Sequence, residues 1–131
     1  MDRTATQHAG IAGESINGVN WAILAARTDK PEADIKKAKD AYEVAASVKL
    51  TAQRMMLTAR ELKLLMAKWH EEGHLVTAPE TSLDDTITDF TKAMADAEEA
   101  AKTLWFALSR GTDAMAPIGW QTDTTARPTA K

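Results

Sequence analysis

The sequence predicts an all-α protein, in which a long antiparallel helical hairpin and a shorter N-terminal helix form a coiled-coil-like three-helix bundle with irregular terminal arms. Ala and Thr are abundant whereas Val and Ile are few, which favours helix over sheet. Gly and Pro are scarce between residues 32 and 110. Apolar residues recur in alternating steps of three and four along two long segments, which is the spacing of paired helices.

The length of 131 residues predicts a single all-α domain, 1–131, that can bury a core without disulfides. We expect an N-terminal arm over residues 1–13, a short helix over 15–28, a long helix over 30–73, a helix over 82–110 and a C-terminal arm over 111–131. Both ends of the chain are rich in Thr, Gly, Pro and Ala and lack a helical period, which predicts the arms.

The short helix over 15–28 is indicated by Ser15 or Asn17 as its N-cap and by one apolar face. Trp21 lies beside that face, which carries Ile16, Val19, Ile23 and Ala26. We expect this helix to lie against the hairpin, because Trp105 and Phe106 make the end of the 82–110 helix apolar nearly all round.

The long helix over 30–73 is expected to begin with Asp29 as cap and Pro31 in the first turn, where its missing N–H costs nothing. No further Gly or Pro occurs before Gly73. Its apolar stripe predicts the side that faces the next helix, and consists of Ala38, Ala41, Ala45, Val48, Ala52, Met55, Ala59, Leu62, Met66 and Trp69.

The helix over 82–110 has Ser82 as its predicted N-cap and Gly111 as its predicted stop. Its apolar stripe consists of Leu83, Ile87, Phe90, Met94, Ala97, Ala101, Leu104 and Leu108. The short connection from Gly73 to Thr81 predicts that the two long helices are antiparallel. Bases dominate the second half of the long helix and acids the helix after it, so the pairing is also favoured by charge.

The composition excludes several classes of function. Sixteen Lys and Arg against 19 Asp and Glu give a net charge of -3, so nucleic acid is not expected as a partner. Without cysteine there is no disulfide, thiolate nucleophile or thiolate metal site. The chain begins without a signal-peptide pattern, and no apolar run approaches the roughly 20 residues that span a bilayer. We expect a cytoplasmic or virion-associated protein with no membrane partner.

The segment from His70 to His74 fits the H-E-x-x-H pattern of zinc proteases. In that pattern two His one turn apart bind the metal, and the Glu is the general base. The stretch HEEGHLV resembles the zinc helix of the membrane-anchored AAA proteases, although no ATPase motif accompanies it. This resemblance implies zinc bound by His70 and His74, with Glu71 as the base. A third ligand would come from Glu80, Asp84, Asp85 or Asp89.

The same segment is also a good helix end. If Gly73 is left-handed, it stops the helix, and His74 leaves the face that carries His70. We expect this second reading, with no catalytic residue, no metal and no cofactor. No Ser-His-Asp grouping, phosphate-binding loop or carboxylate-His iron motif occurs elsewhere in the sequence.

The remaining apolar side chains include several candidate interaction residues. Trp120 lies in a Pro- and Gly-flanked segment, and it either anchors the chain to another subunit or folds back on its own bundle. Met56 and Leu57 lie beside the apolar stripe and are candidates for a second interface. The remaining aromatic candidates are Trp21, Trp105 and Phe106.

We therefore expect a non-enzymatic, oligomeric assembly or interaction protein, which binds itself or a larger assembly such as a phage virion. Uninterrupted heptads, few catalytic residue types and two arms favour this function. One alternative is a small zinc-dependent hydrolase centred on His70, Glu71 and His74. Another is an inhibitor or regulator that docks on a larger enzyme.

Overall fold

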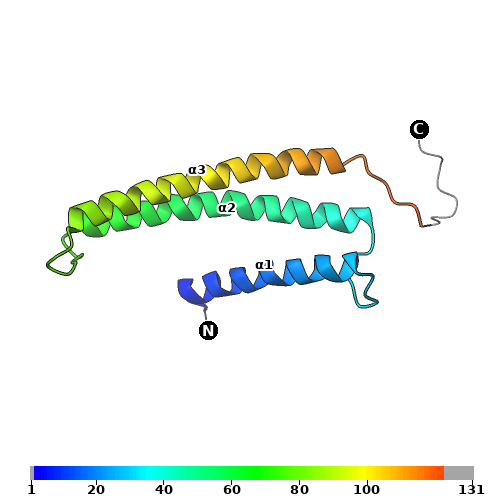
Figure 1. Ribbon diagram of the computed structural model, residues 1–131, viewed down its shortest axis with the longest axis horizontal. Coiled ribbons are helices and arrows are strands. Elements are labelled where there is room, and N and C mark those ends of the chain that lie inside the picture. Colours follow the sequence, from blue (N-terminus) through cyan, green and yellow to red (C-terminus); the bar gives the residue numbers. More distant parts are fainter. Residues whose placement is uncertain (1, 123–131) are drawn as a thin grey trace. The chain divides into compact units, whose positions relative to one another are not determined.

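Three α-helices make up the part of the chain that the computed structural model describes, residues 2–122 (Figure 1). They are α1 (Ala5–Arg27), α2 (Ala38–Glu71) and α3 (Leu83–Met115), and these residues contain no strand. α2 and α3 run antiparallel, joined by a short connection at the end that is green in Figure 1. The prediction of an all-α chain with a long helical hairpin is confirmed.

The chain divides into two compact units. The first unit comprises residues 1–44 and 117–131, and its described part contains α1, the following connection and the first turns of α2. The second unit, residues 45–116, is the hairpin made by the rest of α2 and α3. That both units belong to one domain stays a prediction from chain length.

α1 begins inside the stretch 1–13 that composition predicts to be an arm, so that prediction is wrong. The Thr4 hydroxyl accepts a hydrogen bond from the backbone N–H of Gln7 at 3.1 Å, and the Gln7 side chain accepts one from the N–H of Thr4 at 2.9 Å. This capping box satisfies two N–H groups at the start of the helix. It offsets the helix cost of Gly10 and Gly13, which is about 1 kcal/mol each.

Asp29 ends α1 and does not cap the next helix. It has a φ of 56°, in the left-handed region. Its N–H donates to the carbonyl of Ala26 at 3.3 Å, and the N–H of Lys30 donates to the carbonyl of Ala25 at 2.9 Å. These two bonds are the pattern of a Schellman motif, which closes a helix at a left-handed residue.

α2 accordingly begins at Ala38, and the predicted start at residue 30 is wrong. Pro31 disfavours helical geometry at the residue before it, so a helix cannot continue directly out of the turn. The start of α2 is fixed instead by Asp40, whose carboxylate accepts a hydrogen bond from the N–H of Lys36 at 2.9 Å.

α3 begins as predicted but ends later. The Ser82 hydroxyl accepts a hydrogen bond from the N–H of Asp85 at 3.2 Å, which confirms the N-cap. The helix then continues through Gly111 to Met115, so the predicted stop at residue 110 is wrong. Thr112 is buried just beyond Gly111, and this packing offsets the helix cost of glycine, about 1 kcal/mol.

Each helix of the hairpin contributes two rows of residues to the interface between them, with heptad spacing. The d rows are Ala45, Ala52, Ala59 and Met66 in α2, and Ile87, Met94, Ala101, Leu108 and Met115 in α3. The a rows are Lys49, Met56, Lys63 and His70 in α2, and Thr91, Glu98, Trp105 and Thr112 in α3. All of these residues are buried or half-buried, so one of the two rows on each helix is largely polar.

Two contacts fix how the helices are aligned. His70 Nε2 lies 2.9 Å from Asp84 Oδ1 near the turn, and Lys49 Nζ lies 5.8 Å from the ring centroid of Trp105 near the open end. Both pairs fit the same antiparallel register.

The most buried apolar side chains of the hairpin are alanines. Among the described residues, the buried apolar side chains are Ala52, Ala59 and Ala101, which are 1%, 7% and 9% exposed. Small side chains let the helix axes approach closely, but each removes little apolar area from water, and burial stabilises by only about 25 cal/mol per Å². The larger apolar side chains between the two helices, such as Ile87, Met94 and Leu108, are only half-buried.

Candidate interaction surface

The segment from His70 to His74 forms the end of α2. Gly73 has a φ of 79°, its N–H donates to the carbonyl of His70 at 3.1 Å, and the N–H of His74 donates to the carbonyl of Trp69 at 3.0 Å. This is a second Schellman motif. A zinc site on this helix requires His70 and His74 on the same helical face. His74 lies beyond the helix end and does not share the face that carries His70.

The two imidazoles also have different partners. His70 Nε2 contacts Asp84 at the start of α3, whereas His74 Nε2 lies 3.7 Å from Glu72 Oε1. Glu71, the base in the zinc hypothesis, is the last residue of α2 and is exposed. In residues 2–122 no three His, Cys, Asp or Glu side chains gather where they could hold a metal ion. The segment is therefore a helix end, and the contact between His70 and Asp84 links it to the start of α3.

The apolar stripe predicted for α2 coincides only in part with the surface of α2 that faces α3. The d row of α2 belongs to the stripe and to that surface, but three large residues of the stripe are exposed: Met55, Leu62 and Trp69. The residues half-buried in their place are Met56, Lys63 and His70. The prediction that Met55, Leu62 and Trp69 face α3 is therefore wrong. Lys63 and His70 can lie in the interface instead, because long polar side chains pack their aliphatic stems there and keep the polar end at the edge.

Because α2 turns its d and a rows toward α3 and not its whole apolar stripe, a wide apolar surface is left on one side of the hairpin. Next to each d row lies a g row, and beyond the g row lies a c row. The g rows are Val48, Met55, Leu62 and Trp69 in α2, and Leu83, Phe90, Ala97, Leu104 and Gly111 in α3. The c rows are Thr51, Thr58 and Leu65 in α2, and Thr86, Ala93, Ala100, Ala107 and Ala114 in α3. In an antiparallel pair the g rows of both helices flank the paired d rows. From Ala45 to Trp69 and from Leu83 to Met115, no c, d or g position carries Asp, Glu, Lys, Arg or His. We call this surface the charge-free face. Its exposed large side chains include Met55, Leu62 and Leu104, which are 55%, 44% and 46% exposed.

The charged side chains lie on the other sides of the hairpin. Arg60 Nε donates to Glu98 Oε2 at 2.9 Å, and Lys63 Nζ lies 3.5 Å from Glu98 Oε1. The hydrogen bond from Arg60, helped by the charges of Arg60 and Lys63, holds the pKa of Glu98 below its usual 4.5, although desolvation opposes this. Two bases of α2 thus pair with one acid of α3, in the direction that the distribution of charge predicts.

Met56 and Leu57, predicted together as a second interface, are separated in the structure. Met56 is half-buried in the a row of the hairpin. Leu57 is exposed in a row of leucines with heptad spacing, Leu50, Leu57 and Leu64. This row follows the e row, so it lies on the other side of α2 from the charge-free face.

Trp105 and Phe106 form an aromatic pair near the open end of the hairpin. Their ring centroids are 4.8 Å apart with an interplanar angle of 59°. Trp105 is half-buried beneath Lys49, in a geometry that suits a cation–π interaction. Phe106 is exposed. Of the two predicted interaction residues, Trp105 thus contributes to the hairpin itself.

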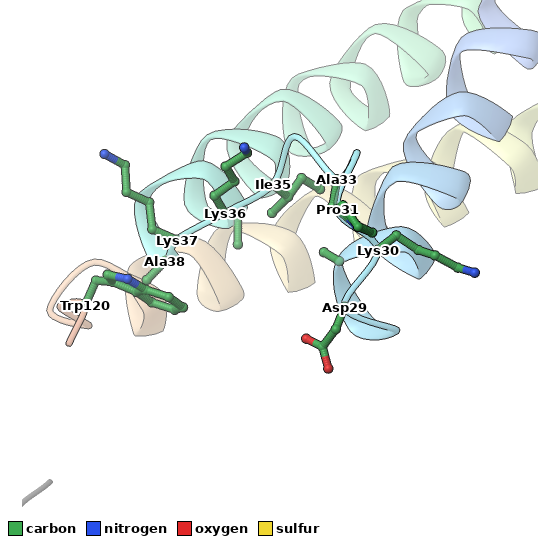
Figure 2. Close-up of a pocket in the computed structure, with 11 residues that line it drawn as sticks. Asp29, Lys30, Pro31, Ala33, Ile35, Lys36, Lys37, Ala38 and Trp120 are labelled. Atoms are coloured by element: carbon green, nitrogen blue, oxygen red, sulfur yellow. The ribbon is translucent and has the colours of Figure 1, made fainter. Parts of the chain in front are cut away.

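Trp21 and Trp120 belong to the first unit, and both are exposed. Trp120 borders an open cavity of about 570 Å³, whose apolar lining includes Pro31, Ile35 and Ala38. Figure 2 shows Lys30, Lys37 and Asp29 at its margin with their charged ends directed away from one another. The cavity therefore offers an apolar surface without a converging set of charges.

Comparison with known proteins gives no match: neither a family model, nor a curated protein, nor a solved structure is significantly similar to the chain. In the described part of the chain, no helix has both the length and the apolar composition needed to cross a membrane.

Proposed function

We propose that the protein is a non-enzymatic assembly protein that packs the charge-free face of its hairpin against other protein. One observation carries this proposal: the hairpin interior is closed by alanines, while large apolar side chains line one uncharged side. Contiguous exposed apolar surface of this kind marks interaction sites on soluble proteins. The product of assembly is an oligomer or a larger particle, and a phage virion is the context proposed from the sequence.

The magnitudes favour assembly as well. Fully burying a Leu or Met side chain contributes about 1.5 to 3 kcal/mol, whereas an alanine methyl contributes about 0.8 kcal/mol. Because Met55, Leu62 and Leu104 are each only about half exposed, covering them adds an apolar stabilisation similar to that of the three buried alanines. A partner on the charge-free face would therefore add substantially to the burial within the hairpin.

The two alternative functions fare differently. A zinc hydrolase needs His70 and His74 on one helical face, and the left-handed Gly73 separates them. A regulator that docks on a larger enzyme would use the same charge-free face, and it differs from the proposed function in the identity of the partner.

The proposal is tested by size-exclusion chromatography with light scattering over a concentration series of the full chain. We expect a mass above the 14.2 kDa of one copy at tens of micromolar, where an interface with a Kd of about 1 μM is nearly fully occupied. The melting temperature should rise with protein concentration, because assembly stabilises the folded state by mass action. A monomer at every concentration, with a constant melting temperature, would contradict self-assembly.

A further inference from the structure

We infer that the charge-free face binds a second copy of this chain, so that two hairpins pack face to face around a two-fold axis as a four-helix bundle. This inference rests on the proposed function and names the partner. Three properties of the face support it: the distribution of charge, the distribution of side-chain size, and the area.

The distribution of charge suits self-pairing. In a two-fold interface the same surface is used by both copies, so a charge near the axis meets the same charge on the partner. A face without any charge on two helices avoids this repulsion along its whole length. The opposite side of the hairpin, where Arg60 and Lys63 meet Glu98, lacks this property.

Side-chain size is graded along the part of the face that α2 contributes. Near the turn this part carries Leu62, Leu65 and Trp69, and near the open end it carries Ala45, Thr51 and Ala52. A two-fold axis that lies in the plane between the two faces and runs perpendicular to the helices places the turn end of one α2 on the open end of the other. Large side chains of each copy then meet small ones of its partner, which is the complementarity that helix packing needs.

The area is sufficient for a stable dimer. At about 1.5 Å per residue the stretch from Ala45 to Trp69 is about 37 Å long, and two helices at about 8 to 10 Å separation make the face about 18 Å wide. Each copy thus offers roughly 650 Å², or about 1,300 Å² for the pair, within the range of about 1,200 to 2,000 Å² of specific interfaces.

The first experiment measures mass by light scattering for the full chain and for matched variants. The wild type should have twice the mass of one copy, 14.2 kDa. Leu62→Glu combined with Leu104→Glu places two charges on the face and should give a monomer, with helicity by circular dichroism retained. Gln53→Glu adds a charge on an exposed position of α2 outside the face, and this control should remain a dimer.

A second experiment does not depend on disrupting the interface. Because the sequence contains no cysteine, a single introduced thiol reports on one position. Met55→Cys lies near the middle of the face, and a short bismaleimide should cross-link it into covalent dimers in high yield. Gln53→Cys, on the polar side of the same helix, should give little cross-linking under the same conditions.

The outcomes separate this inference from the proposed function. A wild-type monomer overturns the two-fold dimer but leaves the charge-free face to a different protein. If Leu62→Glu then lowers the melting temperature of that monomer, the face is covered by the chain's own residues, which contradicts the proposed function as well. An oligomer that persists in the Leu62→Glu, Leu104→Glu variant but dissociates with Leu57→Glu supports assembly and overturns the use of this face. A dimer without cross-linking at Met55→Cys likewise overturns the two-fold arrangement.

Discussion

Gly73 gives the most direct test of the helix end. Gly73→Ala should lower the free energy of unfolding by about 1 to 2 kcal/mol, because a Cβ is disfavoured at a φ of 79°. Steric contact adds nothing, since the new Cβ would meet no atom within 4 Å. Urea denaturation at fixed protein concentration measures the change, and Gly73→Asn should lose less because Asn tolerates the left-handed region.

The matched control is Gly18→Ala in the middle of α1, where the added Cβ also meets nothing within 4 Å. Without a left-handed backbone, this change should stabilise the protein by up to about 1 kcal/mol. If Gly73→Ala stabilised the protein equally, Gly73 would not be left-handed, and His70 and His74 could share a face after all.

Glu98 predicts a dependence of stability on pH. Its pKa is lowered in the folded state, mainly by the hydrogen bond from Arg60, so the ionised carboxylate stabilises the fold. This stabilisation is fully present above the unfolded pKa, near 4.5, and is lost as pH falls through the lower folded pKa. Glu98→Gln should therefore melt at a lower temperature than the wild type at pH 7, and the difference should vanish in acid.

The control for this prediction is Glu99→Gln. Glu99 neighbours Glu98 on α3, is exposed and makes no ion pair among the described residues. Its substitution removes the same charge from the chain but should give a much smaller difference between pH 7 and acid. Equal pH profiles for the two variants would show that Arg60 and Lys63 do not stabilise Glu98 specifically.

At the scale of the helix pair, the closest packing is at the alanine layers of the hairpin. Ala52 is 1% exposed, and Ala52→Leu should lower the free energy of unfolding by about 1 to 3 kcal/mol, because the larger side chain forces the helices apart. Ala67→Leu is the control, since Ala67 is exposed on the same helix and its change should stay within about 0.5 kcal/mol. Equal effects in chemical denaturation would argue against alanine packing between α2 and α3.

The sequence predicts the hairpin well, but it does not predict which side of α2 faces α3. Heptad spacing, Ser82 as a cap and Gly73 as a stop are local signals, and the structure follows them. The apolar stripe marks where apolar residues lie on each helix, but it does not say which part of the stripe meets the neighbouring helix. Lys63 and His70 in the a row show that partly polar rows can fill an interface, which a reading of apolar positions alone misses.

The helix ends that differ from the predicted ones depend on competing local signals. The Thr4 and Gln7 capping box is visible in the sequence, but Gly10 and Gly13 weigh against a helix there. Asp29 is suited either to begin a helix or to end one in the left-handed conformation. The hydrogen bonds from the N–H groups of Asp29 and Lys30 to carbonyls of α1 show that it ends one. The charge-free face, in contrast, can be read from the sequence once the a rows are known.

For the whole molecule, assembly should depend on the hairpin and not on the C-terminal segment. Trp120→Ala should leave the oligomer mass unchanged in light scattering, because Trp120 borders a cavity lined by its own unit and lies outside the charge-free face. Conversion to a monomer would instead make Trp120 the anchor on another subunit, which is the alternative left open by the sequence.

The proposed dimer has a consequence for how much of this protein a cell can keep. If a second copy covers the charge-free face, the stability of the hairpin depends on the concentration of the protein. Chains made in excess of their partners spend more time unfolded, and unfolded chains are the ones that proteases remove. The small side chains at Ala52, Ala59 and Ala101 would thus tie the lifetime of each copy to its incorporation, so that the supply of subunits adjusts itself to the demand for them.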